Sequence, residues 1–229
     1  PQGRAVNDAT RIAFVGQSGT GKSHAAKSWA ADAQKRGARL LVVDPLDEWS
    51  RAGSSAQGGA RPCRHRASAD DVLADPARFL DSSTLSLAVV VDSDEHAAVE
   101  QVAELVDAAM ATGDLLMVLE EVGLYSGPDV RADGAKRALT RLATRGRHAR
   151  VPSAYCAQRL VQVPASARAQ LTDARVFRQV HPADLAALAD LVGIGGAQHG
   201  SKHHTGKALV ELVSRLPNRQ HAAWSALSE

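Results

Sequence analysis

Aromatic residues are scarce in this 229-residue chain, at 3% of the total. Proteins that bind single-stranded nucleic acid stack successive bases on aromatic side chains, so this composition argues against a single-strand platform. The formal net charge is only +2, and a field of one sign therefore does not extend over the whole molecule. The basic residues are mostly arginine and cluster locally, which leaves a local polyanion contact open.

Cysteines and long apolar runs are also few. Cys63 and Cys156 lie too far apart for a metal-ligand motif, and we expect Cys156, within an apolar run, to be buried in a protein of a reducing compartment. No apolar run approaches the roughly 18 residues of a membrane-spanning helix, and no signal-peptide pattern opens the chain. We therefore expect a cytoplasmic protein without a transmembrane segment, forming one domain over residues 1–229 with a short N-terminal tail at about 1–9.

A glycine-rich stretch at residues 16–23 fits the pattern G-x-x-x-x-G-K-[ST]. The apolar run 12–15 before it reads as a strand, and residues 24–36 read as a helix, which is the context this phosphate-binding motif requires. Lys22 would reach the β- and γ-phosphates of ATP, and the Ser23 hydroxyl would bind Mg²⁺. The expected nucleotide-binding residues are Gly16, Gln17, Ser18, Gly19, Thr20, Gly21, Lys22, Ser23 and His24.

Strands and helices alternate along the rest of the chain, which predicts an α/β fold with a mostly parallel central sheet flanked by helices. We expect a surface loop at 51–68 and further loops at 124–133 and 193–206. Further strands are expected at 39–44, 85–91, 115–119, 151–158, 174–180 and 220–226, and helices at 70–80 (interrupted at Pro76), 94–111, 134–144, 164–171, 182–191 and 207–216.

Polar residues that end strands are the candidates for chemistry, because carboxyl ends of parallel strands gather at one edge. Glu120 and Glu121 end an apolar strand. We expect Glu120 to help bind Mg²⁺, and Glu121 to orient or deprotonate the attacking water. Gln158 ends the strand expected beside the phosphate loop and could bond the γ-phosphate. Lys22 and the two glutamates should meet across adjacent strand tips.

Other residues leave alternatives open. Asp44 also ends an apolar strand and could bind a phosphate acceptor, as in small-molecule kinases, or support the metal. Arg147 is the candidate arginine finger that completes a neighbouring subunit's site, with a solvated helix face as the alternative for its basic run (Arg141, Arg145, Arg147 and Arg150). The arginines of the loop 51–68 (Arg51, Arg61, Arg64 and Arg66) fit a polyanion or plain solvation equally. His199, His203 and His204 favour a solvated or DNA-near loop over a metal site.

Three stretches together resemble the FtsK/HerA superfamily of ring-forming DNA-pumping ATPases, a RecA-like class of P-loop NTPase. They are the loop 16–23, the acid-ended strand 116–121, and residues 145–159, in which a Gly-Arg segment precedes a strand ending in Ala157-Gln158. One departure is Glu120, where the family usually has Asp. A chain with no added module most resembles the genome-packaging ATPases of membrane-containing viruses.

This resemblance implies an ATPase that translocates double-stranded DNA with ATP and Mg²⁺. It implies a homo-oligomer in the form of a hexameric ring, with Gln158 as γ-phosphate sensor and Arg147 acting in trans. For a virus it also implies a membrane or capsid anchor protein and a place in the host cytoplasm or at the virion vertex. The alternatives are a cellular HerA-like DNA-processing ATPase, a small-molecule or nucleoside kinase, and an assembly protein that nucleotide only organises.

Overall fold

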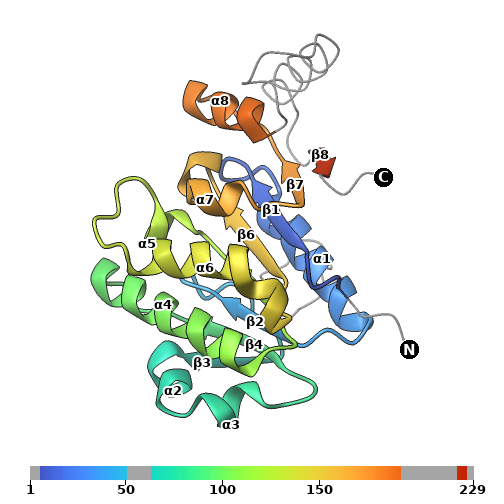
Figure 1. Ribbon diagram of the computed structural model, residues 1–229, viewed down its shortest axis with the longest axis vertical. Coiled ribbons are helices and arrows are strands. Elements are labelled where there is room, and N and C mark those ends of the chain that lie inside the picture. Colours follow the sequence, from blue (N-terminus) through green and yellow to red (C-terminus); the bar gives the residue numbers. More distant parts are fainter. Residues whose placement is uncertain (1–5, 51–62, 192–220, 226–229) are drawn as a thin grey trace.

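The computed structural model describes residues 6–50, 63–191 and 221–225. Within these residues the chain forms an eight-stranded sheet in the order β3-β4-β2-β5-β6-β1-β7-β8 (Figure 1). Its pairs are parallel apart from the antiparallel pair β7–β8, which confirms the expected mostly parallel α/β sheet. The strands are β1 (Arg11–Val15), β2 (Leu40–Val43), β3 (His65–Ser68), β4 (Ser86–Val90), β5 (Leu116–Leu119), β6 (Ser153–Ala157), β7 (Asp173–Val176) and β8 (Ala222–Ser225).

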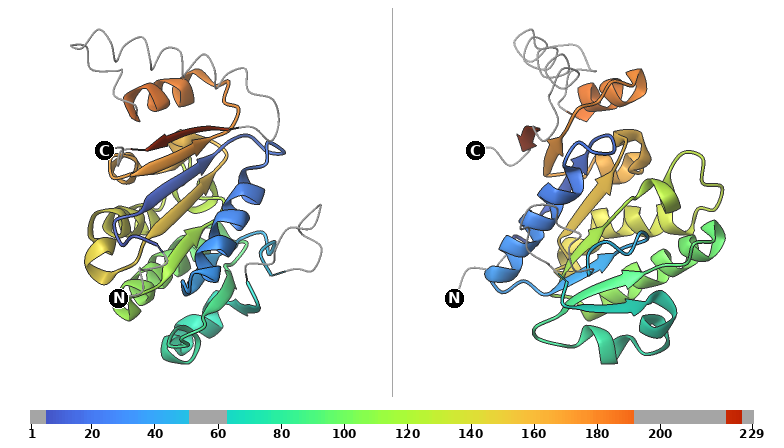
Figure 2. Two further views of the ribbon diagram at one scale, coloured as in Figure 1. Left: turned by 90° about the vertical axis from the view of Figure 1, so that its right-hand side faces the viewer. Right: turned by 180° about the vertical axis from the view of Figure 1, so that it is seen from behind.

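Helices cover the two faces of the sheet unequally, as the views of Figure 2 show. Among the described helices, α1 packs on one face, and α2 to α8 contribute to the core on the other. The helical segments are α1 (Lys22–Lys35), α2 (Ala69–Ala74), α3 (Pro76–Leu80), α4 (Glu95–Thr112), α5 (Gly123–Ser126), α6 (Gly134–Ala149), η1 (Leu160–Gln162), α7 (Ala165–Arg168) and α8 (Pro182–Leu191).

Strand β1 illustrates why apolar runs become central strands here. Successive side chains of a strand point to opposite faces, and both faces of this sheet are covered. Ala13 and Val15 therefore enter the larger core, whereas Ile12 and Phe14 pack with α1. Because the strands are parallel, β1, β5 and β6 all end at one edge of the sheet, and the loops that follow them lie together there.

The structure corrects several expected boundaries. The loop expected at 51–68 contains β3, an edge strand whose first two residues are exposed and which therefore lacks an apolar run. Helix α6 continues to Ala149, beyond the expected end at Thr144. Strand β7 ends at Val176 and α7 at Arg168, so both are shorter than expected.

Gly146 lies inside α6. A methyl group at this position would lie 2.8 Å from the carbonyl oxygen of Val151, so the glycine lets the segment that follows the helix pack closely against its last turns. The expected helix 207–216 and the histidines His199, His203 and His204 lie outside the described residues. Among the helices that are described, none combines the length and the apolar character needed to span a membrane.

Candidate nucleotide-binding site

The glycine-rich loop joins β1 directly to α1. Gly21 stands immediately before the helix at φ 98°, a left-handed conformation that glycine adopts without steric cost. The loop is braced by the Thr20 hydroxyl, which donates to the Gln17 carbonyl at 2.7 Å, and by the Gly16 N–H, which donates to the Ala157 carbonyl at 3.1 Å. Gln17, Ser18 and Gly19 are exposed, so this turn is open to a ligand at the start of a 14-residue helix.

Two side chains that begin α1 meet the two glutamates that follow β5. The Ser23 hydroxyl donates to Glu120 Oε1 at 2.6 Å, and the Lys22 ammonium donates to Glu121 Oε1 at 2.9 Å. Lys22 Nζ also lies 3.8 Å from Glu120 Oε1. Residues separated by about a hundred positions in the chain therefore form one charged cluster.

A backbone turn at Glu121 lets two successive carboxylates face the same cluster. Side chains of neighbouring residues in a strand point in opposite directions, but Glu121 leaves the strand with φ 46°. This left-handed conformation costs a non-glycine residue about 1 kcal/mol or more. The next N–H, that of Val122, donates to the Cys156 carbonyl at 2.9 Å and holds the turn against β6.

Strand β6 lies between the phosphate-loop strand and the acid-bearing strand. This corrects the expectation that Lys22 and the glutamates meet across adjacent strand tips. Gln158, which ends β6, occupies the intervening position, and its amide donates to Glu121 Oε2 at 3.3 Å. The exposed Gln158 side chain therefore stands beside the cluster, next to the open face of the loop.

Burial and mutual attraction set the charges of the cluster. Burial opposes the charge on Lys22, but attraction to Glu120 and the contacts with Glu121 outweigh it and raise the pKa of the ammonium. Burial raises the pKa of Glu120, and the nearby Lys22, Cys156 thiol and Ser23 hydroxyl offset this only in part. Lys22 is therefore firmly protonated, while an ionised Glu120 is costly without a further cation.

One oxygen of Glu120 matches the metal that the motif implies. Glu120 Oε2 is fully buried and has no hydrogen-bond partner among the described residues, although a buried polar atom normally has one. Mg²⁺ prefers oxygen ligands, keeps several waters and takes one or two protein ligands in phosphate sites. The Ser23 hydroxyl and the Glu120 carboxylate supply that donor set, so the residues present fit Mg²⁺.

A second layer of contacts, which the sequence analysis missed, holds Gln158 and Glu120. The buried Gln179 amide donates to the Gln158 carbonyl at 3.1 Å, and the Tyr125 hydroxyl donates to the Glu120 carbonyl at 3.0 Å. Arg159 Nε donates to the fully buried Asp184 at 2.9 Å, which ties the end of β6 to α8. These residues fall in loops and short helices without periodicity, and only their polarity within apolar surroundings signals them.

The remaining candidates lie away from the cluster. His24 is exposed on the first turn of α1. Both carboxylate oxygens of the buried Asp44 accept local backbone N–H groups, from Glu48 at 3.0 Å and from Trp49 at 2.7 Å. Asp44 therefore closes its own turn. Of the loop arginines, Arg66 pairs with Asp47 at 2.7 Å, and residues 51–62 lie outside the described range.

Arg147 lies at the other end of the strands, where their amino ends gather. It belongs to the last turn of α6, which leads into the start of β6, and its charge acts on Arg11 at the start of β1. The side chain is exposed and lies 3.4 Å from His148. Arg147 therefore does not contribute to the phosphate-loop cluster of its own chain.

No protein-family model matches this sequence, and no curated protein matches it. Solved structures do match over nearly the whole chain. The genome packaging NTPase B204 from Sulfolobus turreted icosahedral virus 2, in complex with AMPPCP, has a TM-score of 0.65 at 15% identity, covering 96% of this chain and 93% of that chain.

Two further structures extend the comparison. The DNA-packaging ATPase B204 from Sulfolobus turreted icosahedral virus has a TM-score of 0.62 at 13% identity, covering 96% of this chain and 94% of that chain. VirB4 of Thermoanaerobacter pseudethanolicus has a TM-score of 0.61 at 11% identity, covering 96% of this chain and 87% of that chain. The fold is therefore that of P-loop NTPases, and the expected resemblance to packaging ATPases is confirmed in the fold.

Proposed function

We propose that this protein is a Mg²⁺-dependent ATPase that translocates double-stranded DNA, and that it packages a viral genome. The observation that carries the proposal is the cluster of Lys22, Ser23, Glu120, Glu121 and Gln158 around one exposed glycine loop. Likeness of fold to a genome packaging NTPase that binds AMPPCP supports the same reading. Each member of the cluster has a chemical task in phosphoryl transfer to water.

The tasks follow from the atoms that face the loop. Loop N–H groups and the Lys22 ammonium bind the phosphate oxygens. Ser23 and Glu120 would hold Mg²⁺, which would neutralise the negative charge of the phosphate oxygens. A triphosphate competes with Glu121 for Lys22, which lies 2.9 Å from that carboxylate. Glu121, released from this contact, accepts a proton from the attacking water, and Gln158 bonds the γ-phosphate.

We further propose that the protein works as a ring in which Arg147 of one subunit serves the site of the next. Arg147 is exposed and lies at the far edge of the sheet, so it is available to a neighbour rather than to its own loop. The ring would hold double-stranded DNA through phosphate contacts that weaken with salt. A capsid or membrane protein would anchor it, at the virion vertex or in the host cytoplasm.

The kinase alternative needs Asp44 to bind a phosphate acceptor. Both carboxylate oxygens of Asp44 instead accept backbone hydrogen bonds within its own turn. The assembly-protein alternative does not explain why Glu121 pairs with Lys22 and Gln158 beside the loop. A motor hydrolyses ATP without an added acceptor and responds to DNA length, whereas a kinase needs a small acceptor and an assembly protein does not turn over.

The deciding experiment measures ATP hydrolysis and particle mass by light scattering, with and without long double-stranded DNA. We expect a ring in the presence of ATP, multiple turnovers, and stimulation by long duplexes that short duplexes and higher salt reduce. Lys22→Ala should lose turnover. Full hydrolysis in Lys22→Ala, or a monomer that transfers phosphate only to a small acceptor, would contradict the proposal.

A further inference from the structure

A pair of rings lies beside the phosphate loop, on the side away from the glutamates. Phe177 follows β7, and its N–H donates to the Val15 carbonyl at 2.7 Å. A methyl group at Gly16 would lie 2.4 Å from Phe177 Cβ, so this residue stands against the first residue of the loop. The ring centroid of His221, immediately before β8, lies 5.1 Å from that of Phe177.

The two rings differ in what they can contact. Phe177 is only 1% exposed and can act only as a support. His221 is exposed and presents its ring to solvent. Partial burial and the nearby Arg175 lower the pKa of His221, so its imidazole is mostly neutral at pH 7. A neutral, exposed ring backed by a buried one is suited to stack on another flat ring.

The strand order decides which part of a nucleotide would face this pair. The glutamates and Gln158 follow β5 and β6, on one side of β1, whereas β7 and β8 lie on the other side. A triphosphate held by the loop has its γ end at Lys22 and the glutamates. Its α-phosphate and nucleoside therefore extend the opposite way, over the ends of β7 and β8.

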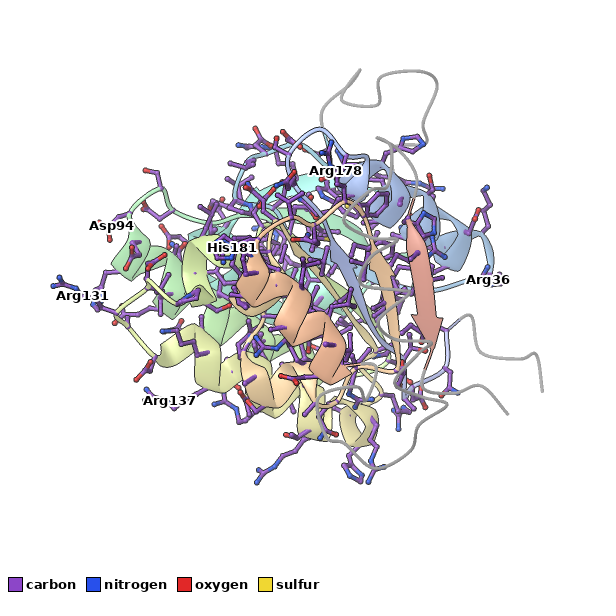
Figure 3. The ribbon with its side chains drawn as sticks, turned by 90° about the horizontal axis from the view of Figure 1, so that it is seen from above. Arg36, Asp94, Arg131, Arg137, Arg178 and His181 are labelled. Carbon is purple, nitrogen blue, oxygen red and sulfur yellow. The ribbon has the colours of Figure 1, made fainter. Side chains whose placement is uncertain are left out.

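The antiparallel pairing of β7 with β8 places the two rings opposite each other, just beyond the paired residues Val176 and Ala222. Arg175 and Ala223 are register partners, each two residues from Phe177 or His221 on the same strand face. Figure 3, which views the molecule from above, labels Arg178 in the segment that follows β7.

We propose that His221, supported by Phe177, is the stacking surface for the purine base of the nucleotide. This inference rests on the proposed nucleotide site and adds to it the residue that binds the base. Stacking uses a ring face that every base has, so the gain in affinity should be similar for adenine and guanine nucleotides. Inorganic tripolyphosphate has no base and should gain nothing from His221.

The test compares the binding of AMPPCP and of tripolyphosphate, each with Mg²⁺, by titration calorimetry of the full chain. His221→Ala should bind AMPPCP about tenfold more weakly, with an unchanged affinity for tripolyphosphate. His221→Phe keeps a flat ring and should restore AMPPCP binding. His96→Ala, which removes an exposed histidine from α4 on the other face of the sheet, is the matched control and should behave as the wild type.

Three results would overturn the base site: unchanged AMPPCP binding in His221→Ala, an equal loss for AMPPCP and tripolyphosphate, or no recovery in His221→Phe. The equal loss would mean that the substitution had damaged the loop rather than the base contact. A wild-type protein that binds neither ligand would instead contradict the proposed function. The two proposals therefore fail in different ways.

Discussion

The charged side chains at the carboxyl ends of the strands (the carboxyl edge) and those at the amino ends (the amino edge) differ in burial and pairing. At the carboxyl edge, the side chains of Lys22 and Glu120 are 5% and 2% exposed and lie 3.8 Å apart. At the amino edge, the last turns of α6 present Arg145, Arg147 and His148 to solvent. One edge is a buried and mutually compensated cluster, and the other is an exposed group of basic side chains.

The difference shows what each edge can do alone. Buried charges are costly unless partners and ligands compensate them, so the carboxyl edge is prepared for a cation and an anion. Exposed charges are screened and contribute little to stability, so the basic end of α6 acquires a role only when another molecule meets it. Substitutions at the carboxyl edge should therefore act within one chain, and those at the amino edge only in an assembly.

The largest effect is expected at the amino edge within a ring. Arg147→Ala should lower hydrolysis by about 10³-fold or more, because an arginine from a neighbour stabilises transition-state charge, while nucleotide binding stays intact. Mixing Arg147→Ala with Lys22→Ala should restore part of the activity, since one variant keeps the site and the other keeps the arginine. Steady-state hydrolysis of the mixtures measures this.

Arg137→Ala is the control for that experiment, because Arg137 is an exposed arginine near the start of the same helix (Figure 3). It should leave hydrolysis near the wild-type rate. If Arg147→Ala hydrolyses normally, or if mixing restores nothing, the role in trans has to be abandoned.

The next effect concerns the carboxyl edge within one chain. Glu121→Gln keeps the shape of the side chain but cannot accept the proton of the attacking water. The turnover number should fall by about 10²- to 10⁴-fold, and the affinity for AMPPCP should change little. Rapid-quench hydrolysis together with calorimetry separates the two quantities. A loss of binding equal to the loss of rate would show that Glu121 serves the fold of the loop.

A smaller effect, on the free energy of unfolding, is expected at Gly16, where the loop is tightly packed. Gly16→Ala would bring a methyl group 2.4 Å from Phe177 Cβ and 2.7 Å from Thr20 Oγ1. The free energy of unfolding should fall by about 1–3 kcal/mol, and nucleotide binding should fall with it. Gly37→Ala is the control, since Gly37 has φ 93° and open space within 4 Å, so it should cost stability without affecting binding. Thermal unfolding and calorimetry give both readouts.

The smallest effect concerns pH. Because burial raises the pKa of Glu120 in the folded state, the folded protein binds its proton more tightly than the unfolded chain. The stability from this group is present below the ordinary glutamate pKa and is lost as pH rises through the raised value. In nucleotide-free protein, Glu120→Gln should therefore melt a few degrees above the wild type at pH 7–8, with the gap closing toward pH 4. A variant that melts below the wild type at pH 8 would contradict this.

Local patterns predicted much of the fold and the residues that gather at the candidate site. The apolar runs and the loop motif predicted β1, β5 and β6 and singled out Lys22, Ser23, Glu120 and Glu121. The edge strand β3 was missed because His65 and Arg66 face solvent, which gives it the composition of a loop. The end of α6 was placed too early, at Thr144 instead of Ala149.

The place of the Gln158 strand beside the phosphate-loop strand was predicted, but the full order of the strands was not. The insertion of β6 between β1 and β5 is a property of the whole sheet, and it places Gln158 between the loop and the acids. The contacts of Gln179 and Asp184 with the end of β6 likewise depend on how α8 and its preceding segment return to that edge. The spacing of residues within either segment does not predict these contacts.

The most direct test of the account is a crystal structure of the chain with Mg²⁺ and AMPPCP. The account predicts Mg²⁺ bound by Ser23 Oγ and the Glu120 carboxylate, directly or through one water, with Lys22 on the β- and γ-phosphates. Glu121 should then lie within hydrogen-bond reach of a water in line with the γ-phosphate. A metal held by other residues, or a triphosphate away from the loop, would contradict it.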